Sequence, residues 1–508
     1  MKYLTEVYNI IVLKLGIMSE LESRVGFFDQ AVLSLIMIFI WTGSDMWGHS
    51  LWVNETDAMS YAEHGLSGFG YGYGGFVFLL HILWQLFGEN DLVFRSLSLI
   101  SSLLTMIVIY RICVFLHDRK SGIIASFIFL WSGYGIEFGM QVRDYAIHSF
   151  ILISITYWCF RIIEEDSSNE CNKKLGNSSL LASFGVWFVS DHWFCLFFIL
   201  FLFTSFIVSS IGGKFRVESL RKLPLAIFPP IMTLCGLLFF ELVRMIHAIS
   251  NSLDGEHHLG GGSVPLVTME PDIFLGVITS YSIILSAIVI LSTTIGTICF
   301  FLRDDSPSLR FLGGLSASTL LMWISLSAGQ YHLHGLVVER YFYFWFPLIC
   351  IICGASMSET IKMISSLDYI DSRALIIIPY LLVGLVSVSA EIEPNTEPYG
   401  DMRGGFDAIE SEVGDSSFSI ISRPPEHVLQ YYIRQFDLSP DEIIGAWHVS
   451  ELESEKVCQI KSEVVVVVSL QSGWILEESS ICLERAGYIR DEGATFSKSG
   501  DTIWFWRK

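Results

Sequence analysis

The chain has 508 residues, of which 52% are apolar and only 16% are charged, and its mean hydropathy is positive. A soluble chain carries roughly a quarter charged residues, so this composition excludes an ordinary soluble protein and predicts a membrane protein. The formal net charge of −21 also argues against nucleic acid as a partner, because an acidic surface repels it.

Residues 1–25 are expected to lie on the cytoplasmic surface of the membrane. Val7, Ile10, Ile11, Leu15 and Met18 follow the spacing of one helical face, which predicts an amphipathic helix in the interface. The segment lacks a signal-peptide cleavage pattern.

Apolar runs recur over residues 26–390, which we interpret as the membrane domain. A helix that crosses the bilayer needs roughly 20 mostly apolar residues, and this rule gives about eleven spans. Their centres lie near Ile36, Ser102, Phe129, Ile153, Gly185, Leu202, Leu234, Ile288, Leu320, Pro347 and Val383. The run 76–87 is apolar but short, which favours a helix at the interface or half embedded in the membrane.

Loops rich in lysine and arginine alternate along the chain with loops that have few of them, and this pattern predicts how the chain is oriented across the membrane. Residues 42–94 contain neither, whereas the loops around 117–120, 161–174 and 214–222 contain several. Positive loops are retained in the cytoplasm, so the N-terminus is predicted inside. An odd number of spans then places the C-terminal segment outside the cell membrane.

Residues 391–508 are predicted to form a small extracytoplasmic α/β domain. They contain 22 acidic and 10 basic residues, a balance that favours solvation in a salty medium over a cation-binding face. Residues 418–421, 464–469 and 503–506 read as strands, and 428–436 and 475–486 as helices. We expect this domain to recognise the acceptor or to pack over the site. Cys458 and Cys482 allow one disulfide, whereas the apolar context of Cys350 and Cys353 favours packing.

Three predicted outer segments, 52–64, 137–145 and 329–341, carry charged and aromatic residues at membrane depth, where an ionisable group is costly. Each alone also fits interface anchoring, because tyrosine and tryptophan gather at bilayer surfaces and arginine snorkels. Together they supply a carboxylate that would take a proton from an acceptor hydroxyl and guanidinium groups that would bind a leaving phosphate. All three lie on the same predicted side, as a single site requires.

Four pieces of the sequence resemble one known superfamily. They are Ser50-Leu-Trp-Val-Asn-Glu55 with Asp57-Ala-Met-Ser-Tyr61, Gly88 ahead of Arg95, Gly139-Met-Gln-Val-Arg-Asp-Tyr145, and Arg340-Tyr341 leading to Pro347. In this order and spacing they resemble the dolichyl-phosphate-mannose protein mannosyltransferases of the GT-C fold. That superfamily includes the aminoarabinose transferases and archaeal glycan-assembly enzymes. The likeness covers most of the membrane part.

The resemblance implies a polytopic α-helical GT-C enzyme that transfers a sugar from a dolichyl- or polyprenyl-phosphate carrier. The sugar is expected to be a hexose such as mannose, and its transfer is expected to invert the anomeric carbon. The acceptor would be a glycan, a protein or a lipid. The chain departs from the family where Asn54 precedes Glu55 and where a proline pair is replaced by the glycine and tyrosine run 68–76.

We expect Asp57 to be the catalytic base, with Glu55 as its neighbour or as a metal ligand, although either carboxylate fits the role. The donor phosphate is expected to bind Arg95, Arg143, Arg340, Tyr145 and Tyr341. The substrate is expected to contact Gln141, Tyr61, Trp52 and His64.

A divalent cation such as Mg²⁺ or Mn²⁺ is a further possibility. Asp191, His192, His332 and His334 are candidate ligands, although histidines at a membrane interface also serve as hydrogen-bonding anchors.

Two rival functions remain at this point. An oligosaccharyltransferase would share the fold, but the C-terminal segment lacks a tryptophan-rich WWDYG-type motif. A flippase or transporter of lipid-linked sugars would show repeated halves with paired broken helices, and no such repeat is visible.

Overall fold

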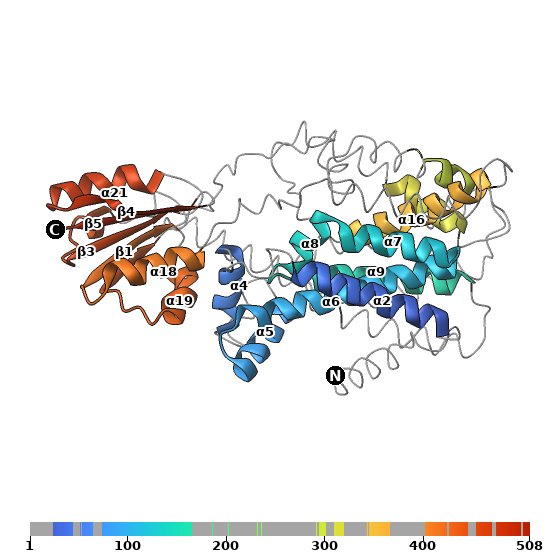
Figure 1. Cartoon of the computed structure of the whole chain (residues 1–508), viewed down its shortest axis with the longest axis horizontal. Helices are drawn as coiled ribbons and strands as arrows, with labels where there is room; N and C mark the ends of the chain where they lie inside the picture. Colours follow the sequence, from blue (N-terminus) through green and yellow to red (C-terminus); the bar gives the residue numbers. More distant parts are fainter. Residues whose placement is uncertain are drawn as a thin grey trace.

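The computed structural model describes residues 24–43, 51, 53–63, 74–164, 294–300, 309–319, 345–365, 402–423, 426–445, 454–469, 474–498 and 501–508, with a few single residues between them. Figure 1 shows a helical bundle with a small α/β domain at one end. The N-terminal segment 1–23, and with it the predicted amphipathic helix, lies outside the described residues.

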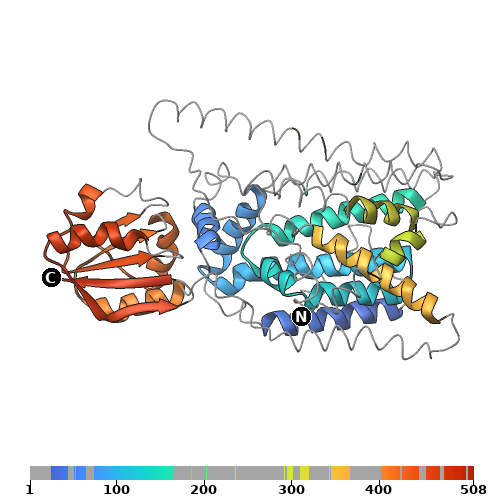
Figure 2. The same cartoon turned by 90° about the horizontal axis from the view of Figure 1, so that it is seen from above.

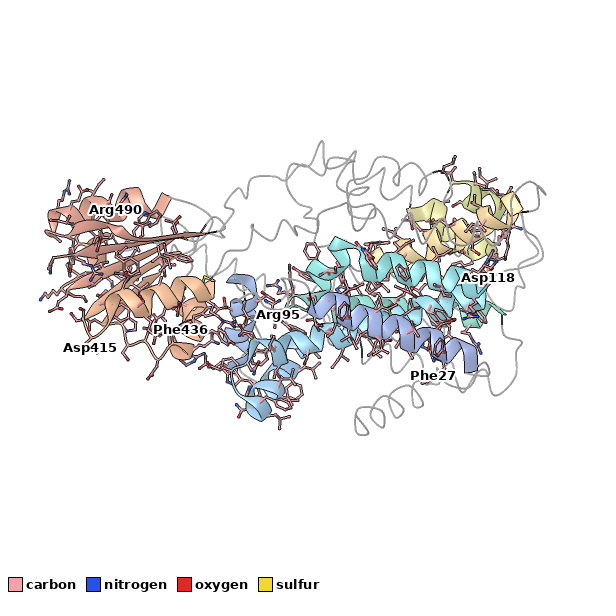
Figure 3. The ribbon with its side chains drawn as sticks, in the orientation of Figure 1. Phe27, Arg95, Asp118, Asp415, Phe436 and Arg490 are labelled. Carbon is pink, nitrogen blue, oxygen red and sulfur yellow. A yellow bond between two sulfur atoms is a disulfide. The ribbon has the colours of Figure 1, made fainter. Side chains whose placement is uncertain are left out.

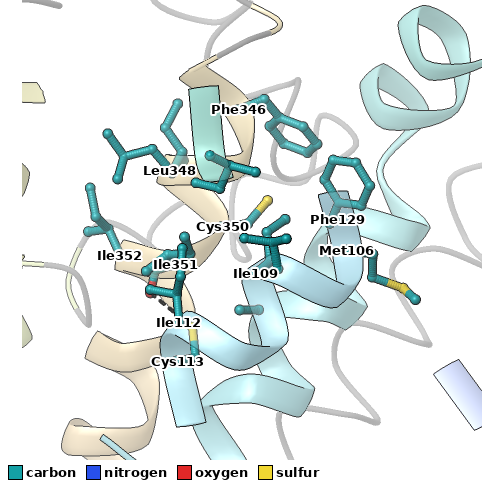
Figure 4. Packing of buried hydrophobic residues seen from close by; sticks show 14 of the residues in the cluster. Met106, Ile109, Ile112, Cys113, Phe129, Phe346, Leu348, Cys350, Ile351 and Ile352 are labelled. Carbon is teal, nitrogen blue, oxygen red and sulfur yellow. Dashed lines mark hydrogen bonds between the residues drawn. The ribbon is translucent and has the colours of Figure 1, made fainter. Parts of the chain in front are cut away.

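Five helices make up much of the described part of the bundle. They are α2 (Arg24–Thr42), α6 (Asp91–Leu116), α7 (Arg119–Trp131), α9 (Tyr145–Glu164) and α16 (Phe346–Ser365). Helix α6 packs against α7 and α9, and α16 crosses α7 and α6. Met106, Ile109 and Phe129 meet Phe346 and Ile351 in the core between them (Figure 4).

Two helices of the described part, Asp91–Leu116 and Phe346–Ile364, are long and apolar enough to cross a membrane. Much of the range in which eleven spans are expected lies outside the described residues, so the number stays a prediction. The span expected around Pro347 is displaced, because Pro347 lies in the first turn of α16, where its fixed φ suits a helix start.

The span expected around Phe129 is divided. Helix α7 has 13 residues and would reach only about 20 Å, and it is followed by the separate helix α8 (Gly133–Met140). Ser132 ends α7 and caps α8, because its hydroxyl accepts a hydrogen bond from the Gly135 amide at 3.3 Å. A Cβ on Gly135 would lie 2.6 Å from the Phe129 carbonyl oxygen, so glycine suits this close approach.

Two shorter helices stand at the end of the bundle that faces the α/β domain: α4 (Val53–Glu63) and α5 (Gly74–Phe87) (Figure 2). The apolar run 76–87 therefore forms a helix, as predicted. Gly88 ends α5 with φ +72°, a left-handed conformation that favours glycine. Asn90 then caps α6, because its side chain accepts from the Leu92 and Val93 amides.

Ion pairs join the helices at the opposite end of the bundle. Asp118 caps α7 and lies 3.0 Å from Lys362 of α16. Arg119 binds Asp29 of α2 at 2.5 Å. Figure 3 shows Arg95 and Asp118 far apart along the bundle, so these pairs lie far from the first-loop helix α4.

The C-terminal domain is a three-layer α/β fold. Its elements are α18 (Met402–Val413), β1 (Phe418–Arg423), α19 (Glu426–Gln435), β2 (Glu442–Gly445), α20 (Ser454–Val457), β3 (Val464–Ser469), α21 (Trp474–Arg485), β4 (Ile489–Lys498) and β5 (Asp501–Arg507). The strand order is β2-β1-β3-β5-β4, in which β2, β1 and β3 are parallel and β5 is antiparallel to β3 and β4.

Alternate residues of the central strands serve opposite layers of this domain. Val464, Val466 and Val468 belong to the core under α18 and α19, whereas Val465 and Val467 belong to the core under α20 and α21. The disulfide that the sequence allowed is present, because Cys458 and Cys482 are joined. Cys350 and Cys353 are buried free thiols in α16, as their apolar context predicted.

Candidate functional site

The site is built around one buried ion pair between two of the predicted residues. Glu55 of α4 and Arg95 of α6 are both buried, and Arg95 Nη2 lies 3.3 Å from Glu55 Oε2. The other oxygen, Glu55 Oε1, accepts a hydrogen bond from the Val142 amide at 2.6 Å. Arg95 Nη1 donates to the Met140 carbonyl at 3.3 Å. These contacts join helix α4, helix α6 and the turn after α8.

One face of α6 binds the backbone of that turn at three points. Besides Arg95, the Ser98 hydroxyl donates to the Gln141 carbonyl at 2.6 Å, and the Ser102 hydroxyl donates to the Gly139 carbonyl at 3.2 Å. Residues three and four positions apart lie on one face of a helix. Arg95, Ser98 and Ser102 therefore all face the backbone of residues 139–141 and form hydrogen bonds to it.

The turn presents an arginine and a tyrosine beside the ion pair. The Arg143 guanidinium lies 5.6 Å from the centre of the Tyr145 ring, a cation–π arrangement. The Asp144 carbonyl accepts from the His148 amide at 2.8 Å, at the start of α9. Gln141, Asp144 and Tyr145 are buried, whereas Arg143 is partly exposed.

Gly139 allows the close packing behind the turn. A Cβ at this position would lie 2.6 Å from the Tyr343 hydroxyl and 2.7 Å from the Trp41 ring. Neither neighbour can move easily, because Trp41 Nε1 donates to the Leu130 carbonyl at 2.8 Å and both side chains are buried. The Ser149 hydroxyl donates to the Tyr343 carbonyl at 3.3 Å, which ties α9 to the approach to α16.

The C-terminal domain contributes residues to this end of the bundle that no sequence pattern singled out. The Tyr432 hydroxyl donates to the Leu51 carbonyl at 2.9 Å, and Tyr431 and Arg403 both donate to the Asp91 carboxylate. Tyr432 lies on the buried face of α19, but the spacing of apolar residues along a helix does not show which element covers that face.

The structure brings five of the predicted site residues together: Glu55, Arg95, Gln141, Arg143 and Tyr145. Tyr61 and Asp57 share helix α4 with Glu55, and for Asp57 only the backbone is described. The remaining candidates lie outside the described residues: Trp52, His64, Asp191, His192, His332, His334, Arg340 and Tyr341.

The geometry disfavours Glu55 as a metal ligand, because both of its carboxylate oxygens already have protein partners. Within the described parts of the chain, no three His, Cys, Asp or Glu side chains are grouped to hold a metal ion. The four predicted metal ligands all lie elsewhere in the sequence, so a metal site there stays a prediction.

The fold matches solved structures of membrane enzymes over nearly its whole length. ArnT from Cupriavidus metallidurans, bound to undecaprenyl phosphate, superposes with a TM-score of 0.58 at 11% identity, covering 95% of this chain and 98% of that one. The apo oligosaccharyltransferase from Archaeoglobus fulgidus superposes with a TM-score of 0.53 at 11% identity, covering 93% of this chain and 70% of that one. No protein-family profile and no curated protein sequence matches the chain.

These matches show that the chain has the GT-C fold, which ArnT and the oligosaccharyltransferase share. The resemblance seen in the four sequence pieces is therefore confirmed at the level of the fold.

Proposed function

We propose that this protein is a glycosyltransferase that moves a monosaccharide from a polyprenyl-phosphate carrier to an acceptor on the outer face of the cell membrane. The observation that carries the proposal is the Glu55–Arg95 pair, which joins the acidic first-loop helix to the turn bearing Arg143. ArnT shares the fold and was crystallised with undecaprenyl phosphate, which supports a lipid phosphate as the carrier.

Asp57 is the catalytic base in this proposal, and Glu55 is a positioning residue. The Glu55 carboxylate is occupied by Arg95 and by the Val142 amide. Positions two residues apart do not share a helix face, so α4 separates the pairing role of Glu55 from the proton transfer assigned to Asp57. Arg95, expected to bind phosphate directly, is instead assigned to holding Glu55, because it is fully buried.

Arg143, in place of Arg95, is assigned to bind the donor phosphate. It is partly exposed and lies over Tyr145, and a planar guanidinium binds phosphate oxygens in two places. Arg340 and Tyr341 are assigned to the same phosphate on the strength of the sequence resemblance.

The reaction follows from these roles. Asp57 takes the proton of the acceptor hydroxyl, and the freed oxygen attacks the anomeric carbon from the side opposite the phosphate. The bond between this carbon and the phosphate oxygen breaks, and its electron pair leaves with the polyprenyl phosphate. Arg143 stabilises the negative charge that develops there. Attack from the opposite side inverts the anomeric carbon.

The outward orientation draws support from the C-terminal domain. Disulfides persist in oxidising compartments outside the cytoplasm, and Cys458 is bonded to Cys482. That domain contacts α4, so the domain and the proposed base share one side of the membrane. The donor sugar is proposed to be a hexose such as mannose, on the strength of the sequence resemblance.

The test uses purified protein in detergent with a labelled polyprenyl-phosphate hexose and an acceptor fraction. Wild-type protein is expected to transfer the label, and Asp57→Asn is expected to lower the rate by about 10²–10⁴-fold, the usual contribution of general base catalysis. Asp415→Asn, in an exposed turn of the C-terminal domain, is the matched control. Transfer at the wild-type rate by Asp57→Asn would refute Asp57 as the base.

A mass comparison of surface glycans with and without the protein identifies the sugar and the acceptor, whether glycan, protein or lipid. Movement of the lipid-linked sugar across liposomes without any new glycosidic bond would support the rival flippase.

A further inference from the structure

Helix α19 of the C-terminal domain lies against the first-loop helix α4. Tyr432 is buried, and its hydroxyl donates to the carbonyl of Leu51 at 2.9 Å. The Tyr432 ring also stacks on Phe406 of α18, with ring centres 5.4 Å apart, so its position is fixed by the core of its own domain. The C-terminal domain thus holds the backbone two residues before α4 begins and four residues before Glu55.

Arg434, on the same helix, connects the end of α4 with the approach to α6. Its Nη1 lies 3.0 Å from a Glu63 oxygen, and its Nε lies 2.9 Å from a Glu89 oxygen. Glu63 is the last residue of α4, and Glu89 lies between α5 and α6. The guanidinium also lies 5.5 Å from the Trp84 ring centre. One side chain therefore constrains two separate elements of the membrane part.

A third set of contacts holds the start of α6. Asp91 is the first residue of this helix and is buried, and its carboxylate accepts hydrogen bonds from Tyr431 and from Arg403. Asp91 lies one helical turn before Arg95. Its two partners belong to α19 and α18 of the C-terminal domain.

We infer that Tyr432, Arg434, Tyr431 and Arg403 are positioning residues, which set the distance between α4 and α6 and thereby hold Glu55 against Arg95. The inference rests on the proposed function for its catalytic consequence. Its structural basis is that the contacts converge on α4 and on the start of α6, the elements that carry the ion pair. The apolar cores are also continuous, since Met59 and Phe94 belong to the same cluster as Phe406 and Leu429. In Figure 3, Phe436 lies on the side of the domain that faces the bundle.

If these contacts only attached the C-terminal domain to the bundle, weakening them would leave the distance between α4 and α6 unchanged. A positioning device would change that spacing when weakened, and the Val142 amide reports it, because its hydrogen bond to Glu55 depends on the place of α4. Hydrogen exchange at this amide is therefore a readout that needs no transferase activity.

The experiment compares the full-length protein with the double variant Tyr432→Phe/Arg434→Gln by hydrogen exchange and by kinetics. Exchange is expected to become about tenfold faster in peptides covering α4 and Val142, and to stay unchanged in strand β3. A local opening that is easier by that factor corresponds to about 1.4 kcal/mol. We also expect kcat to fall about tenfold with a smaller change in the KM for the donor. Arg434→Lys, which keeps the charge but not the planar fork, is expected to recover part of the rate.

Glu426→Gln is the matched control, because Glu426 is exposed on α19 and its hydrogen bond is to Gln430 of the same helix. Unchanged exchange in α4 and at Val142 in the double variant would overturn the inference. If the double variant unfolds, Arg434→Gln alone decides by the same comparison, since this side chain is 33% exposed. Faster exchange in a protein that transfers no sugar would uphold the positioning role and refute the proposed function.

Discussion

A buried pair such as Glu55 and Arg95 stabilises a fold only while both members are present. Removing charges from water costs several kcal/mol per ion, and mutual attraction with added hydrogen bonds offsets this cost. Here the added bonds come from the Val142 amide and the Met140 carbonyl. The pair therefore requires helix α4 and the turn after α8 to lie together.

This arrangement predicts different behaviour for the two carboxylates of α4. Glu55→Gln leaves the Arg95 charge buried without its counterion, so we expect a loss of about 3–5 kcal/mol of stability together with loss of transfer. Asp57→Asn is expected to lose transfer and keep its melting temperature. Thermal unfolding in detergent measures both, and the double variant Glu55→Gln/Arg95→Met should regain part of the lost stability. An unchanged melting temperature for Glu55→Gln would mean that the pair contributes nothing to the fold.

Most of the residues at the site could be named from the sequence, but their partners could not. Charged residues expected at membrane depth are rare, and this selected Glu55 and Arg143, whereas Arg95 was selected by the family resemblance. Glu55 is separated by 40 residues from Arg95 and by 87 from Val142. Because spacing patterns report only local periodicity, a carboxylate that pairs and a carboxylate that catalyses look alike in the sequence.

At the scale of elements, the central strands of the sheet were predictable and its edge strands were not. Strands β1, β3 and β5 and helices α19 and α21 appear where the patterns placed them. Strands β2 and β4 were not predicted, because they are the two edges of the sheet and their exposed side chains leave no apolar alternation. Helix α18 was also missed, although Met402, Phe406, Ile409 and Val413 share one buried face.

In strong alkali, we expect helix α19 and the rest of the C-terminal domain to separate from the helical bundle. Burial, and then the nearby Asp91 charge, raises the pKa of both Tyr431 and Tyr432 well above the ordinary value near 10. The neutral phenols donate in the folded state, so their contribution is complete below pH 10. It falls as the pH rises further, because the unfolded chain then loses protons that the folded chain retains.

The measurement is an alkaline titration of tyrosinate absorbance, followed with limited proteolysis of the C-terminal domain. Wild-type protein should show a late step, above the ordinary pKa, that coincides with proteolytic release of the domain. Tyr431→Phe/Tyr432→Phe should lack that step. Release of the domain at neutral pH in the wild type would contradict the prediction.

At the scale of the whole molecule, the bundle has two different ends. One end carries α4, α5 and the C-terminal domain, which share a single apolar core. The other end is joined by Asp118 with Lys362 and by Arg119 with Asp29. Helix α6 connects the two ends with 26 residues, about 39 Å of helix, which is enough to cross a bilayer core of about 30 Å.

The two ends should therefore react from opposite sides of the membrane. We expect a membrane-impermeant thiol reagent, added to intact cells, to label a cysteine introduced by Asp415→Cys and to leave one introduced by Lys120→Cys unlabelled. Both positions are exposed, and permeabilised cells should label both, which controls for reactivity. The unmodified chain supplies the background from its own thiols, such as Cys235. The C-terminal domain binds the helix that carries Asp57. Labelling in the reverse order would therefore place the proposed base in the cytosol and contradict the expected orientation of the site.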